Sequence, residues 1–209
     1  MNQAIIFDLD GTLWDSSEQI PAIWNRVFAR YDTGVLITPE ILQSLMGKTM
    51  AEIGRDLFPA LSSDRIEQIM DDCGKEEVAF LTEHGAVLYD GLEDTLKALQ
   101  KDYVLLLVSN CQEGYALSFL TAHHIGPYFT DYEESGRTGL SKAENIRRIM
   151  NRNQIRKAVY VGDTDGDESA SREAGIPFIY AAYGFGKAKE PDAVIESLQE
   201  LPDRVSRMI

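Results

Sequence analysis

The sequence predicts an α/β protein in which a doubly wound, mostly parallel sheet carries an inserted small domain of α-helices. Three observations lead to this prediction. Short apolar runs are typical of buried strands, and helical patterns of roughly 10–15 residues separate them. A long stretch with helical periodicity alone interrupts this alternation after the first run. The 209 residues suffice for one large domain or two small ones.

Four apolar runs are expected to form parallel strands, because they are apolar at consecutive positions, as in strands covered by helices on both faces. They are AIIF (4–7), YVLLLVSN (103–110), AVYVGD (158–163) and PFIYAA (177–182). YFTDYEE (128–134) is a candidate for a further short strand at the sheet edge. The helical patterns between the runs cover residues 91–100, 114–123, 142–151 and 167–174.

The stretch from about Asp15 to Gly85 shows only helical periodicity. SEQIPAIWNRVFARY (17–31) places its apolar residues on one helical face, and TPEILQSLMG (38–47) begins with a Thr cap followed by Pro. Residues 62–85 form a third and longer helical pattern. We therefore predict a core of residues 1–14 and 89–209 and a helical insertion of residues 15–88. The insertion would lie over the carboxyl ends of the strands, where open α/β sheets bind ligands.

The composition excludes several classes of partner. Twenty basic against 34 acidic residues give a net charge of −14, which argues against nucleic acid or an anionic membrane surface as a partner. No apolar run reaches the ~18 residues of a membrane span. The two cysteines, Cys73 and Cys111, are expected to be reduced thiols in the cytoplasm. The oligomeric state does not follow from the sequence.

Polar side chains follow the predicted strands where each one ends. Because the carboxyl ends of parallel strands meet at one edge of a doubly wound sheet, these side chains should converge on one crevice. They are Asp8 and Asp10 after the first run, Ser109 and Asn110 at the end of the second, and Asp163 with Asp165 and Asp167 after the third. Lys142, at the start of a helix, should join them.

Buried carboxylates at one place need a cation, because two unit charges ~4 Å apart repel by roughly 4 kcal/mol at an effective dielectric of 20. Open sites of oxygen ligands suit Mg²⁺, which shares a substrate phosphate, and lysine and serine suit phosphate oxygens. Calcium loops of the EF-hand type do not fit. A loop from Asp163 would need Gly and Glu where Glu168 and Ala174 stand.

DLDGTL (8–13), Ser109-Asn110, Lys142 and GDTDGD (162–167) occur in the order of the four motifs of the haloacid dehalogenase-like (HAD) hydrolases. The resemblance covers the whole chain. The insertion between the first two motifs resembles the small helical cap of the phosphoglycolate phosphatase and β-phosphoglucomutase branch. The resemblance therefore implies a HAD-type core with a cap, and chemistry on a phosphate ester.

The resemblance also implies roles for the catalytic residues. Asp8 matches the nucleophile that forms an aspartyl-phosphate, and Asp10 matches the general acid and base. Lys142 matches the cation that steadies Asp8 and the phosphoryl oxygens. Thr12 matches a residue that contacts the phosphoryl group or supports Asp10. Members that cleave carbon–halogen or phosphonate bonds lack the acid at the place of Asp10, so its presence favours an oxygen ester.

The remaining motif positions match binding residues. Ser109 matches the phosphate-binding hydroxyl, with a backbone N–H of Asn110 nearby. Asp163 matches an Mg²⁺ ligand, beside a side-chain oxygen of Asp8 and the backbone carbonyl of Asp10. Asp167 matches an acid that ligates the metal or orients its water.

Two departures from the family pattern concern the helix of the third motif and the cap. Ala143 stands where many relatives have Pro after the lysine, and MGKTM (46–50) lacks the arginine that is usual in the mutase branch. Lys48 in that stretch is either a solvated loop residue or a cap residue that reaches the substrate. Trp14 either packs the hinge or lines the pocket.

The resulting prediction is a cytoplasmic, Mg²⁺-dependent phosphatase that acts on a small phosphorylated metabolite, similar to phosphoglycolate phosphatases. A phosphomutase of the β-phosphoglucomutase type stays open as an alternative, because it would share every core residue. A non-catalytic binding or regulatory module is the other alternative. Two domains that close over the site would exclude water from it.

Overall fold

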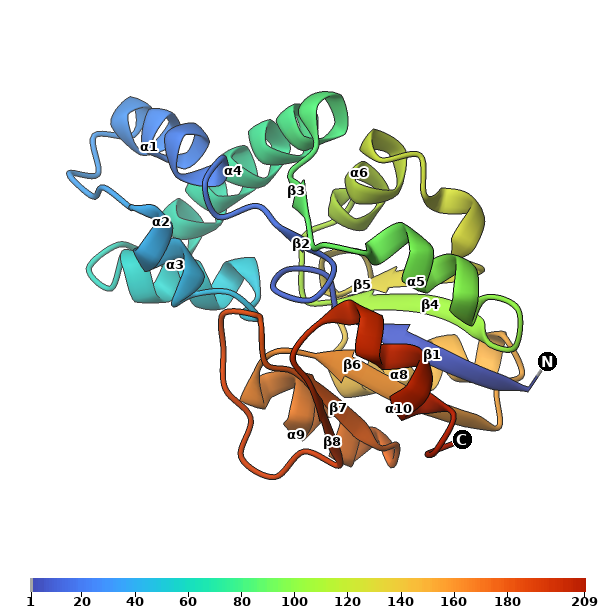
Figure 1. Cartoon of the computed structure of the whole chain (residues 1–209). Helices are drawn as coiled ribbons and strands as arrows, with labels where there is room; N and C mark the ends of the chain where they lie inside the picture. The colour runs from blue at the N-terminus through green and yellow to red at the C-terminus, as the bar shows by residue number, and fades with distance from the viewer. Residues whose placement is uncertain (1) are drawn as a thin grey trace.

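The computed structural model describes residues 2–209 and confirms the predicted α/β class (Figure 1). Six strands form one sheet in the order β5-β4-β1-β6-β7-β8, and every neighbouring pair is parallel. They are β1 (Gln3–Phe7), β4 (Val104–Ser109), β5 (Asp131–Glu134), β6 (Lys157–Gly162), β7 (Phe178–Ala181) and β8 (Ala193–Ile195). β1 lies near the centre of the sheet, so its carboxyl end lies at the middle of the edge where the strands end.

Helices cover both faces of this sheet, which explains why the strands are apolar at consecutive positions. On β1, Ile5 and Phe7 belong to one buried cluster, and Ala4 and Ile6 belong to another. The first cluster includes α5 (Leu92–Leu99), α6 (Tyr115–Ala122) and α10 (Leu201–Val205). The second includes α8 (Lys142–Arg152) and α9 (Asp165–Ala174). The two helical layers fix the sheet in the interior.

The insertion, which we call the cap (residues 15–88), is helical as predicted. Its helices are α1 (Ile20–Arg30), α2 (Pro39–Gln43), α3 (Met50–Leu57) and α4 (Ser63–His84). Two chain segments join it to the core as a short antiparallel ribbon of β2 (Trp14–Asp15) and β3 (Val87–Leu88). The predicted domain boundaries, 14/15 and 88/89, fall in this ribbon, and we keep that division as a proposal.

The cap shares its apolar interior with the core. One cluster of buried side chains runs from β1 through Trp14 to Trp24, Phe28 and Phe58 of the cap. Helix α4 packs along α6, so the cap contacts the core through a helix pair as well as through the ribbon (Figure 1). These contacts place the inner face of the cap over the carboxyl ends of the strands.

Several elements differ from the sequence prediction. The edge strand β5 is confirmed, but β8 and the short helix α10 near the C-terminus were not predicted. β8 has only three residues, of which Val194 is exposed, so no long apolar run marks it. Helix α9 begins at Asp165 instead of 167, because the Thr164 side chain caps it.

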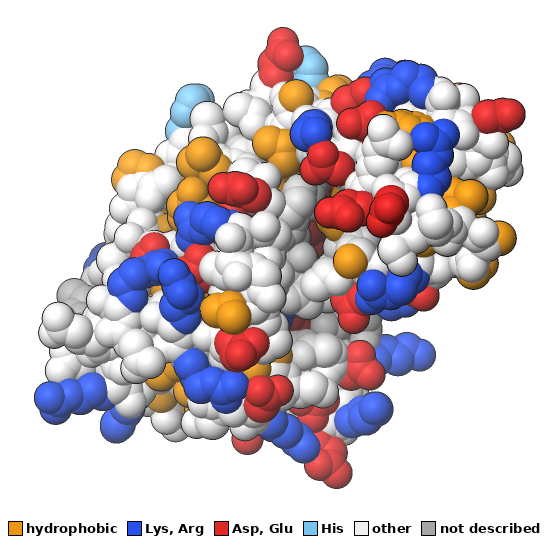
Figure 2. All heavy atoms as spheres, turned by 180° about the vertical axis from the view of Figure 1, so that it is seen from behind, with side chains coloured by type: hydrophobic (Ala, Val, Ile, Leu, Met, Phe, Trp, Pro, Cys, Tyr) orange, Lys and Arg blue, Asp and Glu red, His pale blue; other side chains and the backbone are white. Residues whose placement is uncertain are grey.

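The surface bears on possible partners. Charged side chains of both signs are spread over the face in Figure 2, where the molecule is hollowed between cap and core.

Among the described helices, none has the length and apolar character that a membrane crossing needs. Cys73 and Cys111 are free. A cytoplasmic location stays a prediction.

Two leucines test how much the double helical cover stabilises the sheet. Leu106 on β4 is fully buried, whereas Leu117 on α6 is 50% exposed. We expect Leu106→Ala to lower the free energy of unfolding by about 2–5 kcal/mol, through lost apolar burial and the cavity left behind. Leu117→Ala should cost less than about 1 kcal/mol. Urea denaturation of both variants measures the difference, and equal losses would contradict the assignment of Leu106 to the core.

Candidate active site

The residues predicted from four separate motifs meet at the carboxyl ends of β1, β4 and β6. Asp8 directly follows β1, Ser109 ends β4, and Asp163 directly follows β6. Lys142 is the first residue of α8, which begins there because Ser141 and Glu144 form a capping box. Parallel strand order and one helix start therefore bring these side chains together from positions far apart in the chain.

A buried ion-pair triad lies at the centre. The ammonium of Lys142 donates to Asp8 Oδ1 at 2.9 Å and to Asp167 Oδ1 at 2.5 Å. The three side chains are at most 5% exposed. Burial alone would lower the pKa of Lys142, but Asp167 and Asp8 outweigh it and raise that pKa well above its usual value. Lys142 is therefore held as a cation.

Asp167 also caps the helix that carries it. Its Oδ2 accepts hydrogen bonds from the Thr164 backbone N–H at 3.0 Å and the Thr164 hydroxyl at 2.7 Å. With Oδ1 bound to Lys142, both oxygens of Asp167 are engaged within the protein. This fixes the carboxylate rigidly beside Asp8.

Among the described residues, hydrogen bonds reach only one of the two carboxylate oxygens of Asp163. Its Oδ2 accepts the backbone N–H groups of Phe185 at 2.8 Å and Gly186 at 3.2 Å. Its Oδ1 is buried and has no hydrogen-bond partner among the described residues. An orphaned carboxylate oxygen is costly to bury, so this atom indicates a ligand.

Burial and repulsion between the neighbouring carboxyl groups raise the pKa values of Asp8 and Asp163. Burial, followed by repulsion from Asp167, raises the pKa of Asp8 to about 7 despite the attraction of Lys142. Burial and repulsion from Asp167 and Asp8 raise the pKa of Asp163 to about 8. Both shifts have the sign expected of a site that binds a cation, because a cation would favour the charged forms.

The carboxyl oxygens suit a divalent metal ion. One oxygen from each of Asp8, Asp163 and Asp167 lies within 4.8 Å of the other two, and all three side chains are buried. Carboxylate oxygens are the ligands that Mg²⁺ prefers, and the orphaned Oδ1 of Asp163 is free to provide one. The residues present therefore fit the predicted cofactor.

Asp10 lies beside this cluster in an unexpected hydrogen-bond network. Its Oδ1 accepts from Trp14 Nε1 at 2.9 Å, from Ser16 Oγ at 2.9 Å and from the Tyr115 hydroxyl at 2.7 Å. Burial raises the pKa of Asp10, and the three donors counter that shift in part. Three donors on one oxygen fix the orientation of the carboxyl group.

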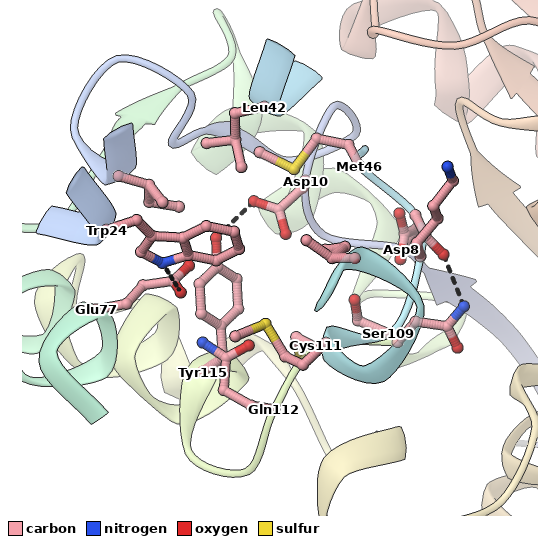
Figure 3. Close-up of a pocket in the computed structure, with 16 residues that line it drawn as sticks. Asp8, Asp10, Trp24, Leu42, Met46, Glu77, Ser109, Cys111, Gln112 and Tyr115 are labelled. Atoms are coloured by element: carbon pink, nitrogen blue, oxygen red, sulfur yellow. Dashed lines mark hydrogen bonds between the residues drawn. The ribbon is translucent and has the colours of Figure 1, made fainter. Parts of the chain in front are cut away.

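A small cavity opens from these carboxyl groups toward the cap. Figure 3 shows Asp8 and Ser109 at one end, Glu77 and Trp24 at the other, and Asp10 and Tyr115 between them. Apolar cap residues complete the wall, among them Ile20, Leu42, Met46 and Ile53. The arrangement gives the site a polar end on the core and a mostly apolar end on the cap.

The remaining predicted site residues take different positions. Thr12 is fully buried, and its hydroxyl has no partner within residues 2–209. The Asn110 amide donates to the cap carbonyl of Gly47 at 2.8 Å and so ties core to cap. Lys48 lines the cavity rim, but its ammonium pairs with Asp56 at 2.7 Å and its side chain is 43% exposed.

Sequence reasoning missed the residues that hold Asp10. The indole N–H of Trp14 donates to Asp10, a role beyond the hinge packing or pocket lining that the sequence predicts for it. Tyr115 lies 105 positions from Asp10 in the sequence. No motif around Tyr115 or Ser16 indicates a contact with Asp10. Glu77 was missed as well, because it belongs to a long polar helix. Only its place on the apolar face of α4, between Cys73 and Leu81, could have singled it out.

The chain is similar to known proteins over nearly its whole length. Residues 5–181 match the family described as haloacid dehalogenase-like hydrolase. A phosphoglycolate phosphatase from Vibrio vulnificus is 28% identical over 221 residues, which cover 96% of this chain and 95% of the relative. A haloacid dehalogenase-like family hydrolase from Streptococcus pneumoniae aligns with a TM-score of 0.81 at 24% identity, covering 97% of both chains. CbbY from Rhodobacter sphaeroides, solved with phosphate, aligns with a TM-score of 0.80 at 20% identity over 96% of both.

The fold and the convergent carboxylates define a hydrolase of the α/β class with a helical cap. The chain belongs to the haloacid dehalogenase-like hydrolase family, because the match covers the core strands β1 to β7 and the whole cap. The predicted resemblance is thereby confirmed, and the chain is an enzyme of that family.

Gly184 tests how closely the loop after β7 must approach Asp163. A Cβ on Gly184 would lie 2.3 Å from Asp163 Cβ and 2.4 Å from the Gly11 carbonyl oxygen, whereas a Cβ on Gly126 would meet nothing. We expect Gly184→Ala to cost about 1–3 kcal/mol of unfolding free energy, since backbone must shift, and Gly126→Ala to cost less than about 1 kcal/mol. Chemical denaturation of both variants checks this, and an unaffected Gly184→Ala would show that the loop has room.

Proposed function

We propose that the protein is an Mg²⁺-dependent phosphatase that hydrolyses small organic phosphate monoesters through an aspartyl-phosphate on Asp8. The observation that carries the proposal is that Asp8, which Lys142 contacts at 2.9 Å, and Asp10 both line the cavity (Figure 3). A nucleophile steadied by a cation and a separately held acid then face the same space. Membership of the haloacid dehalogenase-like hydrolase family supports this reading.

In the first step Asp8 would attack phosphorus, and the bond from phosphorus to the ester oxygen would break. Lys142 orients Asp8 through its 2.9 Å contact and offsets negative charge on the phosphoryl oxygens. Phosphoryl transfer depends mainly on positioning and charge stabilisation, and both are provided by buried, fixed groups here.

Asp10 would give its proton to the departing alcohol oxygen and later take a proton from the water that attacks the aspartyl-phosphate. The second step breaks the bond between phosphorus and Asp8 and releases phosphate. The three hydrogen bonds to its Oδ1 leave Oδ2 as the oxygen that exchanges the proton. Separate environments for two neighbouring carboxyl groups permit separate roles.

Mg²⁺ would be held by Asp8, by Asp163 and by the backbone carbonyl of Asp10, with Asp167 as a ligand or as the residue that orients metal-bound water. When bound, it would supply charge neutralisation among the crowded carboxylates and around the phosphoryl group. The orphaned Asp163 Oδ1 and the raised pKa values of Asp8 and Asp163 support this assignment.

The phosphate group would be bound by the Ser109 hydroxyl, the Asn110 backbone N–H and the Thr12 hydroxyl. The unpartnered Thr12 Oγ1 and the place of Ser109 at the core end of the cavity support these roles. Lys48 stays a candidate for substrate contact only if its pair with Asp56 opens. The name of the Vibrio vulnificus relative makes phosphoglycolate one substrate to try.

The first test is phosphate release from a panel of small phosphate monoesters, with Mg²⁺ and with EDTA, by the wild type and by Asp8→Asn. We expect metal-dependent turnover that falls by at least about 100-fold in Asp8→Asn, because the amide cannot act as the nucleophile. Asp102→Asn, at an exposed position in the loop before β4, is the control variant, since no predicted role falls on it. Colorimetric phosphate detection provides the measurement.

The products separate the alternatives. Transfer of the phosphoryl group to a second sugar phosphate instead of water would identify a phosphomutase. A folded protein that binds Mg²⁺ and releases no phosphate from any monoester would contradict the proposed phosphatase and favour the non-catalytic module.

The hydrogen bonds to Asp10 give a second prediction. Trp14→Phe and Tyr115→Phe each remove one donor and leave an aromatic ring at the position. We expect kcat to fall about tenfold or more with alkyl phosphates, whose leaving oxygen must be protonated. The loss should be smaller with p-nitrophenyl phosphate, whose leaving group is stable as an anion. Steady-state kinetics on both substrates measures the difference.

Tyr31→Phe is the matched control for Tyr115→Phe. It removes a Tyr-to-Asp hydrogen bond of the same length, 2.7 Å to Asp72, on the cap and away from Asp10. Equal losses on both substrates in Tyr115→Phe would show that the tyrosine stabilises the fold without positioning the acid.

A further inference from the structure

The cap end of the cavity contains a buried carboxyl group that the proposed chemistry does not use. Glu77 lies on α4 and is only 3% exposed, although it lines the cavity together with Trp24 and other cap residues. Figure 3 shows it at the end opposite to Asp8 and Ser109. A phosphate held by the core would therefore direct its alcohol part past Asp10 toward Glu77.

Only one of the two carboxyl oxygens of Glu77 accepts a hydrogen bond of ordinary length from the described residues. Its Oε2 accepts the indole N–H of Trp24 at 2.9 Å. Its other oxygen, Oε1, accepts no hydrogen bond of ordinary length within residues 2–209. The Gln112 side chain lies close enough to Glu77 to lower the pKa of that carboxyl group in part, so the two groups are neighbours in the cavity. A carboxyl group buried in an apolar wall with one oxygen open is costly unless a ligand donates to it.

Gln112 provides the complementary group. It lines the same cavity, and its Nε2 is buried with no hydrogen-bond partner among the described residues. The cap end of the cavity thus offers an acceptor on Glu77 and a donor on Gln112. A hydroxyl group can donate to the first and accept from the second, whereas an ammonium only donates and a carboxylate only accepts.

We propose that Glu77 and Gln112 select a phosphate monoester whose alcohol part carries a free hydroxyl group, as in a diol or polyol phosphate. This inference rests on the proposed phosphatase function and names its substrate class. It differs from what the phosphoglycolate phosphatase relatives suggest, because phosphoglycolate presents a carboxylate at that place.

The charges around the cavity disfavour a carboxylate there. Among the described residues that line the cavity, Lys48 alone is cationic, and its ammonium is paired with Asp56 at the exposed rim. A substrate carboxylate would face Glu77 with no free cation beside it. Burial raises the pKa of Glu77 to about 8, so near neutral pH the group takes a proton readily. A substrate hydroxyl suits both forms, because it donates to the ionised Oε1 and accepts from the protonated one.

The space limits the size of the alcohol part. The cavity volume is about 40 Å³, which is room for roughly three water-sized spheres when about 10–15 Å³ holds one. A phosphate monoester exceeds this volume, so the cap must open to admit one. The small space favours a short alcohol part whose terminal group reaches Glu77 and Gln112.

A matched series of phosphate esters tests the proposal. The wild type is assayed with ω-hydroxyalkyl, n-alkyl, ω-carboxyalkyl and ω-aminoalkyl phosphates of two-, three- and four-carbon chains. We expect the hydroxyalkyl ester of the best-fitting length to exceed the three others of that length by at least about tenfold in kcat/KM. A site built to hydrogen-bond a hydroxyl leaves its own buried groups unpaired when that hydroxyl is missing.

Variants assign the preference to the residue. Glu77→Met should bring the ratio of hydroxyalkyl to alkyl phosphate turnover to within about twofold, since Met offers apolar volume without the acceptor. Glu83→Met, an exposed position on the same helix, should keep the wild-type ratio. Because the readout is a ratio, a general loss of activity or stability does not imitate the effect. If Glu77→Met does not fold, Gln112→Met tests the same ratio.

Each outcome decides one of the two proposals. A wild type that prefers the carboxyalkyl or aminoalkyl series, or a ratio that Glu77→Met leaves unchanged, overturns the selection of a hydroxyl group by Glu77. Turnover of p-nitrophenyl phosphate in the same experiment would leave the phosphatase function intact in that case. No turnover of p-nitrophenyl phosphate or of any ester contradicts the phosphatase function itself.

Discussion

The structure depends on one constraint, which is that three buried carboxyl groups, a half-buried fourth and one buried lysine meet at the carboxyl ends of β1 and β6. Asp8, Asp10, Asp163 and Asp167 would repel one another in a low-dielectric site, and Lys142 neutralises only part of that charge. The neighbouring backbone is shaped around this cluster. The N–H groups of Phe185 and Gly186 bind Asp163, and the capping box of α9 holds Asp167. What the protein leaves unsatisfied, above all Asp163 Oδ1, is what a bound cation would complete.

The same region links the acid to the cap. Two of the three donors to Asp10, Trp14 and Ser16, lie in or beside the ribbon that joins cap and core. The third, Tyr115, begins α6, against which α4 of the cap packs. A movement of the cap would have to act through these contacts. The orientation of Asp10 is thus coupled physically to the position of the cap, so closure over a substrate and alignment of the acid can occur together.

The sequence predicted most of the fold and the polar end of the site, because both follow from local rules. Consecutive apolar residues on β1 require helices on both faces, and parallel strands bring Asp8, Ser109 and Asp163 to one edge. The contacts of Tyr115, Glu77 and Gln112 could not be predicted in this way. Each depends on how α4 and α6 pack against each other, and helical periodicity fixes which face is buried without fixing what it meets. The sequence does not predict β8, because a strand of three residues is too short to show a periodic pattern.

Substrate selection and chemistry are separated between the two parts of the chain. The core residues that would bind phosphate lie on strand ends and helix starts, where the backbone is fixed by the sheet. The residues that face the alcohol part lie mainly on α1 to α4 of the cap and on the turn between α2 and α3, where a substitution alters one wall and leaves Asp8 and Lys142 in place. A carboxyl group such as Glu77 can therefore redirect specificity at no cost to the triad. That separation allows a chain that keeps the catalytic residues to present a different surface to the leaving group, as we propose for Glu77.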